Sequence, residues 1–125
     1  MTYPLHKNDA GSFQELAHKS DGIVFSQLSL LTIAPRCTRG GHYHTHKKEW
    51  FCCTHGKCYI ICTEGRTGEQ RSIILEDSIK EFQIVNPYES HIVLNPHDKE
   101  CELLVLCSEE YDPENPDTIK YEPKQ

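Results

Sequence analysis

Short apolar segments alternate with polar turns along most of the chain, and this pattern predicts β-strands rather than helices. No segment carries an apolar stripe of convincing length at the helical period of about 3.6 residues. Gly, Pro, Asn and Asp stand between the apolar segments, as in β-turns. The predicted strands cover residues 23–33, a segment that carries His42 and His44, and residues 49–54, 58–63, 71–75, 81–85, 91–95 and 102–107. Short strands at this spacing predict an antiparallel sandwich or barrel.

Three local features complete the expected organisation. Residues 1–8 show no periodic signal, so we expect a loosely held arm there. The turn at His55-Gly56 joins two strand-like segments and predicts a β-hairpin. Residues 108–125 are acidic and rich in proline, which predicts an extended tail. The 125 residues suffice for one domain with a core of its own, so we expect a single domain over 1–125 with one site.

Charge and cysteine content narrow the class of protein. The net charge is −6, which argues against binding to nucleic acid or to a membrane surface. The chain has neither an apolar run of the roughly 20 residues that a membrane span needs nor a secretory signal at its N-terminus. We therefore expect a cytoplasmic protein. Its seven cysteines lie mostly in apolar segments without a CxxC pair, so we expect buried, reduced thiols.

A histidine-rich segment supplies the candidate chemistry. His42 and His44 alternate along a predicted strand, which places them on one face roughly 7 Å apart. Glu49 begins the next strand and can reach the same point, and His91 at the start of a later strand is the natural fourth ligand. Imidazole and carboxylate ligands suit a divalent transition metal, with zinc favoured over iron, manganese or nickel. Acid-base residues without a metal and ordinary structural histidines remain the alternatives.

The spacing of these residues resembles a known motif pair. H-x-H-x4-E-x6-G at residues 42–56 resembles the first cupin motif, and P-x3-H-x3-N at residues 87–95 resembles the second. Asn86 and Tyr88 stand where cupins usually carry proline and glycine. The resemblance implies an all-β, antiparallel jelly-roll (cupin) barrel.

A narrower resemblance covers most of the chain. The strings DAGSFQEL (9–16), RGGHYH (39–44) and EEYDPENPDT (109–118) are similar to the C-terminal metal-binding cupin domain of capsular-polysaccharide enzymes that act on nucleotide-linked 4-keto-6-deoxy sugars. The RGGHYH string also resembles the sugar-nucleotide 3,4-ketoisomerases, which use the histidine pair without a metal. Glu49 and His91 favour the metal-binding version. A reductase domain, which the capsular enzymes also have, is absent from this sequence.

The resemblance implies a nucleotide-sugar epimerase or isomerase of surface polysaccharide biosynthesis. A base would remove the proton next to the C4 ketone, and a bound metal would stabilise the enolate. His46, Lys47 and Tyr43 are the candidates for proton transfer, although the sequence favours solvated rim positions for His46 and Lys47. Arg39 and Tyr88 are candidates for contact with the substrate, and a solvated turn residue is the alternative for Arg39.

Two other functions remain possible, and the oligomeric state is a separate question. A metal-dependent oxygenase uses a similar ligand set, and a small cupin can also bind a sugar or metabolite without catalysis. Jelly-roll cupins commonly pair, so we expect a homodimer in which the tail or the first strand crosses to the partner. The expected ligand is a nucleotide-linked sugar.

Overall fold

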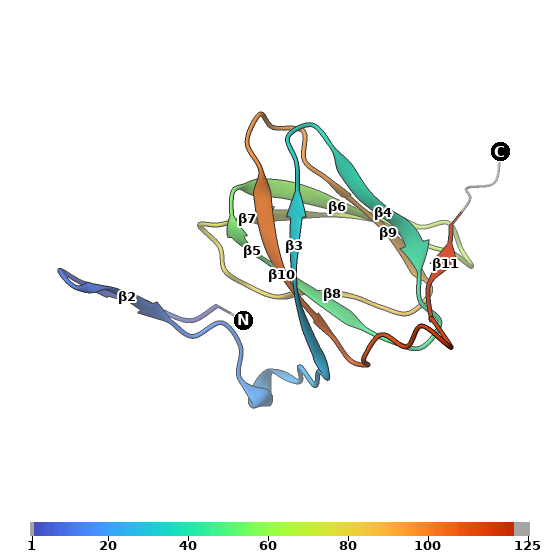
Figure 1. Ribbon diagram of the computed structural model, residues 1–125, viewed down its shortest axis with the longest axis horizontal. Coiled ribbons are helices and arrows are strands. Elements are labelled where there is room, and N and C mark those ends of the chain that lie inside the picture. The colour runs from blue at the N-terminus through green and yellow to red at the C-terminus, as the bar shows by residue number, and fades with distance from the viewer. Residues whose placement is uncertain (1, 122–125) are drawn as a thin grey trace.

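Two antiparallel β-sheets face each other and enclose the core (Figure 1). The computed structural model describes residues 2–121. The four-stranded sheet has the order β3 (Gln27–Ile33), β10 (Cys101–Cys107), β5 (Glu49–His55) and β8 (Gln83–Val85). The five-stranded sheet has the order β11 (Ile119–Lys120), β4 (Thr38–Tyr43), β9 (Glu89–Leu94), β6 (Lys57–Glu64) and β7 (Gln70–Glu76). The predicted all-β, antiparallel architecture is confirmed.

Alternating residues of neighbouring strands build the core. Phe51 and Cys53 on β5 lie opposite Val105 and Leu103 on β10, and all four side chains are buried. They belong to one apolar cluster with Ile60 of the other sheet. Burial of each large apolar side chain stabilises the fold by roughly 1.5–3 kcal/mol. The two sheets are therefore held at a fixed separation by packed side chains.

The cysteines behave as small apolar residues, as predicted. All seven are free thiols, and only Cys37 is exposed. Burial raises the pKa of Cys52 and of Cys62 to about 11, so these thiols stay protonated at neutral pH.

The turn at Gly56 is a corner between the sheets, so the prediction of a hairpin is wrong. Strand β5 pairs with β10 and β8, whereas β6 pairs with β7 and β9. Gly56 has a φ of 85°, and its N–H donates to the Asp77 carboxylate at 3.0 Å. A tight glycine turn serves a corner as well as a hairpin, so the local sequence does not distinguish them. As a result, Glu49 approaches the site from the sheet opposite to His42.

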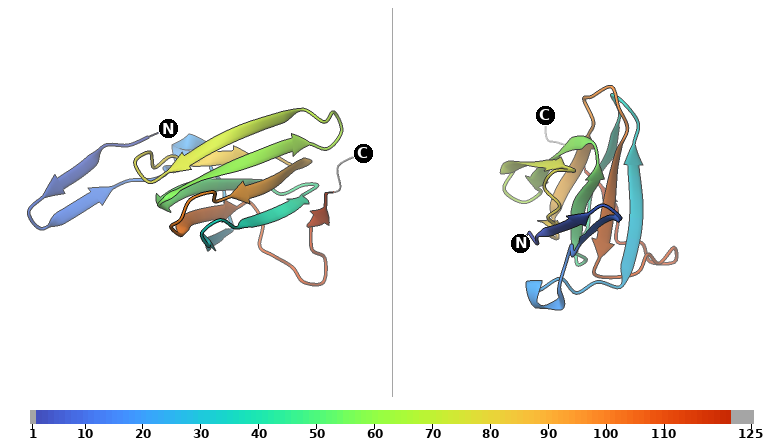
Figure 2. Two further views of the ribbon diagram at one scale, coloured as in Figure 1. Left: turned by 90° about the horizontal axis from the view of Figure 1, so that it is seen from above. Right: turned by 90° about the vertical axis from the view of Figure 1, so that its left-hand side faces the viewer.

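The N-terminal segment forms a hairpin that stands away from the barrel (Figures 1 and 2). Its strands β1 (Leu5–Asn8) and β2 (Gly11–Gln14) pair with each other and form a separate two-stranded sheet. The short 3-10 helix η1 (Lys19–Asp21) follows, and β3 begins only at Gln27 rather than at the predicted residue 23. Within residues 2–121, no helix is long and apolar enough to cross a membrane.

A β-bulge in β4 lets Arg39 and His42 face the same cavity. Arg39 pairs with Val93, and His42 pairs with His91, so one extra residue is accommodated between these pairs. Gly40 and Gly41 have φ angles of 109° and 90°, a backbone conformation that residues other than glycine rarely adopt. Strict alternation would place residues 39 and 42 on opposite faces. The bulge lets both of them line the same cavity.

We predict that Gly40→Ala destabilises the protein more than Gly41→Ala. A Cβ at either position meets the strain of a positive φ, roughly 1–3 kcal/mol. A Cβ at Gly40 would also lie 2.5 Å from the His91 carbonyl oxygen, whereas nothing lies within 4 Å of one at Gly41. Urea unfolding of both variants measures the difference. Equal unfolding free energies would contradict the close approach of β4 to β9.

Candidate metal centre

Three imidazoles converge at one end of the space between the sheets. His42 lies on β4 directly opposite His91 on β9, and His44 follows the end of β4. Their ring centroids lie 4.8 Å apart for His42 and His91, and 5.3 Å apart for His42 and His44. One ring nitrogen of each residue lies within 4.8 Å of the other two. The structure thus brings together three of the four predicted ligands.

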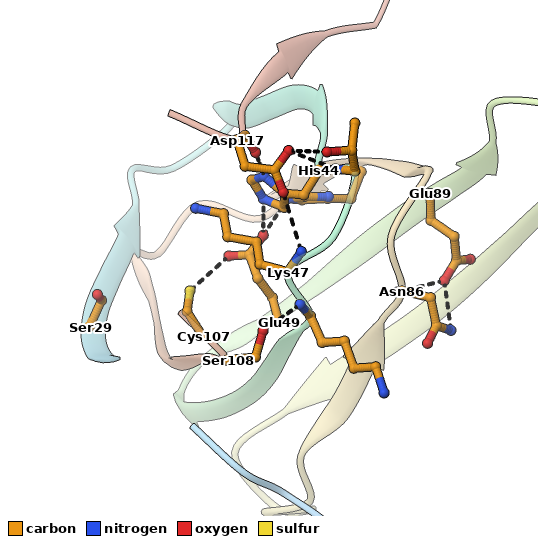
Figure 3. Close-up of polar contacts among 12 residues, drawn as sticks. Ser29, His44, Lys47, Glu49, Asn86, Glu89, Cys107, Ser108 and Asp117 are labelled. Atoms are coloured by element: carbon orange, nitrogen blue, oxygen red, sulfur yellow. Dashed lines mark hydrogen bonds and ion pairs between the residues drawn. The ribbon is translucent and has the colours of Figure 1, made fainter. Parts of the chain in front are cut away.

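Glu49, the fourth predicted ligand, reaches the cluster from β5 in the opposite sheet (Figure 3). Its Oε1 contacts His44 Nε2 closely and lies 3.4 Å from His91 Nε2. The Cys107 thiol donates to Oε2 at 3.5 Å. Burial alone would raise the pKa of Glu49, but its interactions with His44, His91 and Cys107 outweigh burial and lower that pKa to about 2. The carboxylate is therefore ionised and aimed at the imidazoles.

The chemistry of this donor set fits a divalent cation. The Nδ1 of His44 faces the main-chain carbonyl of Asp117, which only accepts, so the ring proton belongs on Nδ1. The lone pair of Nε2 then faces the Glu49 carboxylate, which is also an acceptor. Burial lowers the pKa of His91 to about 4 and also lowers the pKa of His42, so both rings are neutral at pH 7. Neutral imidazoles around an ionised carboxylate are typical metal ligands.

A cavity of about 480 Å³ adjoins the histidines. Arg39 and Lys47 both line it, as do apolar side chains such as Phe51 and Val105. Lys47 is only 7% exposed, and its amine lies 5.9 Å from the centroid of the Tyr111 ring. Two cationic side chains beside the histidine cluster suit a ligand with anionic groups.

The structure does not bring the other three predicted residues into this cavity. Tyr43 points to the opposite face from His42, as strand alternation requires, and its ring stacks on Tyr88 at 6.2 Å. These two tyrosines line a separate pocket with Arg66. The half-exposed His46 pairs with Glu109 at 2.9 Å, away from the cavity. These positions give no support to catalysis by Tyr43 or His46, or to substrate contact by Tyr88 in the cavity.

Tyr88 preserves the turn that a glycine usually makes before the second motif. Its φ is 66°, in the left-handed region that glycine favours. Its N–H donates to the His44 carbonyl at 2.7 Å, and its own carbonyl accepts the Gly65 N–H at 2.9 Å. Both hydrogen bonds hold the unusual conformation. The departure from the motif therefore leaves His91 correctly placed.

The sequence-based prediction missed several residues of the site. Cys107 ends β10, and Tyr111, Asp117 and Thr118 lie in the tail. The main-chain N–H of Tyr111 donates to the side chain of Gln27, another residue of the cavity wall, at 2.9 Å. These contacts join segments far apart in the sequence and leave no periodic signal. The tail is extended, as predicted for the residues up to 121, but it forms part of the site; residues 122–125 lie outside the described residues.

Two facing antiparallel sheets with an H-x-H-x4-E cluster at one end define a cupin of the jelly-roll type. A family profile described as the polysaccharide biosynthesis C-terminal domain matches residues 6–119. The chain belongs to this family.

Known relatives agree with this assignment. The chain is 30% identical over 115 residues to a UDP-2-acetamido-2,6-beta-L-arabino-hexul-4-ose reductase of Pseudomonas aeruginosa; the match covers 92% of this chain and 30% of the reductase. The capsular polysaccharide assembling protein CapF of Staphylococcus aureus superposes with a TM-score of 0.75 at 25% identity, over 97% of this chain and 34% of CapF. The chain thus spans about a third of the length of these relatives.

A smaller solved relative superposes over most of its length. A mutant of the 3,4-ketoisomerase QdtA from Thermoanaerobacterium thermosaccharolyticum, in complex with TDP-4-keto-6-deoxyglucose, gives a TM-score of 0.76 at 22% identity. The superposition covers 96% of this chain and 84% of QdtA. At this level of identity, the similarity establishes the shared fold.

Proposed function

We propose that this domain is a metal-assisted nucleotide-sugar epimerase or isomerase of surface polysaccharide biosynthesis. It would act next to the keto group of a 4-keto-6-deoxyhexose. The observation that carries the proposal is the cluster of three histidines and Glu49 beside a cavity that Arg39 and Lys47 line. The reductase relative and the complex of QdtA with a 4-keto-6-deoxy sugar nucleotide support the choice of substrate class.

His42, His44, Glu49 and His91 would hold the divalent ion, with zinc as the first choice for this donor set. When bound, the ion would polarise the keto oxygen of the sugar as a Lewis acid. The Cys107 thiol would donate to the ionised Glu49 carboxylate, and the Nε2 lone pair of His44 would face the same divalent ion. The apolar wall of the cavity would exclude water from the reacting carbons.

Lys47 is the proton-transfer candidate whose side chain lies in the cavity wall. Lys47 is buried and lines the same cavity as the histidines, and in this proposal its amine would lie near the sugar carbon next to the ketone. Removal of the proton from that carbon leaves an electron pair delocalised into the carbonyl group. A proton returned to the opposite face gives the epimer, and a proton returned to another carbon moves the keto group. Arg39 at the cavity would hold the diphosphate with its planar guanidinium.

Exchange with solvent deuterium tests this proposal. We expect the purified protein in heavy water to place deuterium in the sugar ring of a 4-keto-6-deoxyhexose nucleotide. Lys47→Met should lower the exchange rate by about 10²–10⁴-fold, the usual contribution of a positioned acid or base. Lys48→Met is the matched control, because Lys48 is the exposed neighbour and should leave the rate unchanged.

The outcomes separate the two parts of the proposal. No ring deuterium with UDP- or TDP-linked 4-keto sugars would contradict the isomerase function and favour a cupin that only binds its ligand. Exchange at the wild-type rate in Lys47→Met would contradict only the role of Lys47 and would leave the isomerase function standing.

We also propose that two copies of the chain associate through the N-terminal region. Leu28 and Leu30 on the outer face of β3 are 59% and 62% exposed, and Phe13 on the protruding hairpin is 67% exposed. Strand β3 lies at the edge of its sheet, and such edges readily pair with another chain. Sedimentation should show a single species of twice 14.4 kDa. A monomer at micromolar concentration would contradict the dimer.

A further inference from the structure

Asp117 stands out in the tail because it is buried among exposed residues. Every other residue from 109 to 120 is exposed, whereas Asp117 is 9% exposed. Its carboxylate accepts hydrogen bonds from the main-chain N–H groups of Thr45 at 2.8 Å, His46 at 2.9 Å and Lys47 at 3.2 Å (Figure 3). It also accepts the Thr45 hydroxyl at 2.6 Å. One carboxylate therefore satisfies three consecutive N–H donors of the turn that follows His44.

The main chain of the same residue contacts the metal-site imidazole. The carbonyl oxygen of Asp117 accepts the Nδ1–H of His44. This hydrogen bond sets the tautomer and the ring orientation, so that Nε2 faces Glu49. The carboxylate anchors the turn, and the carbonyl orients the ring. Both groups belong to one residue, so the anchored turn and the orientation of the ring are linked through Asp117.

The anchored turn also carries the side chain that lines the cavity. Lys47 donates its N–H to Asp117 and presents its amine beside the histidines. His44 and Lys47 therefore both hydrogen-bond to one residue of the tail. Removal of the carboxylate would leave three N–H groups of this turn without their acceptor.

We propose that Asp117 is a positioning residue that orients His44 as a metal ligand and fixes Lys47 at the cavity. This inference rests on the metal centre proposed above. It assigns the tail a role in assembling that centre rather than in covering the barrel surface.

Cobalt binding to the purified chain tests this role without the sugar substrate. We expect Asp117→Asn to bind Co²⁺ about 10–100-fold more weakly than the wild type, with a changed visible absorption spectrum. Asparagine keeps the size and the main-chain carbonyl, but its NH₂ group would face N–H donors of the turn. Hydrogen exchange at the amides of residues 45–47 should also become faster. Asp112→Asn, an exposed change in the same tail, is the control and should match the wild type.

Thr45→Val is a second variant, which serves if Asp117→Asn does not fold. It removes the hydroxyl that donates to the carboxylate and that also lies 3.1 Å from His46 Nδ1, and we expect about 2- to 10-fold weaker Co²⁺ binding. Wild-type affinity and an unchanged spectrum in both folded variants would overturn the role of Asp117. A wild-type chain that binds no Co²⁺ would overturn the metal centre itself and this inference with it.

Discussion

The contact between the Glu49 carboxylate and the histidine cluster is the interaction on which the site depends. A buried, ionised carboxylate is strongly unfavourable unless it is paired and hydrogen-bonded. Here His44, His91 and the Cys107 thiol surround it. Because Glu49 belongs to one sheet and the histidines to the other, the packing between the sheets also sets the distances between the candidate ligands. The packing of the core therefore also determines the geometry of the site.

Unusual backbone conformations lie next to the candidate ligands. Gly40 and Gly41 form the bulge directly before His42, and Tyr88 adopts a positive φ three residues before His91. Such conformations persist only where surrounding contacts hold them. The tyrosine N–H bonded to the His44 carbonyl is one such contact. The strained segments thus connect the candidate ligands to one another through the main chain as well as through their side chains.

Strand alternation and motif spacing predicted which histidines come together. His42 and His44 share a face because they are two residues apart, and the second motif identified His91 as their partner. The same alternation places Tyr43 on the opposite face, so that residue could have been set aside from the sequence. The corner at Gly56 could not be predicted from the sequence, because its local sequence is that of a hairpin. Asp117 could not be found either, because it meets His44 across 73 positions of the chain.

Metal content of the purified protein tests the central claim most directly. We expect about one divalent ion per chain, as for a single preformed site, in the wild type and in the exposed control variant Glu110→Ala. Glu49→Ala should lose this ion while it keeps the fold, because one of the four candidate ligands is gone. A wild type without a stoichiometric metal, or a Glu49→Ala variant that retains it fully, would contradict the assignment of these four ligands.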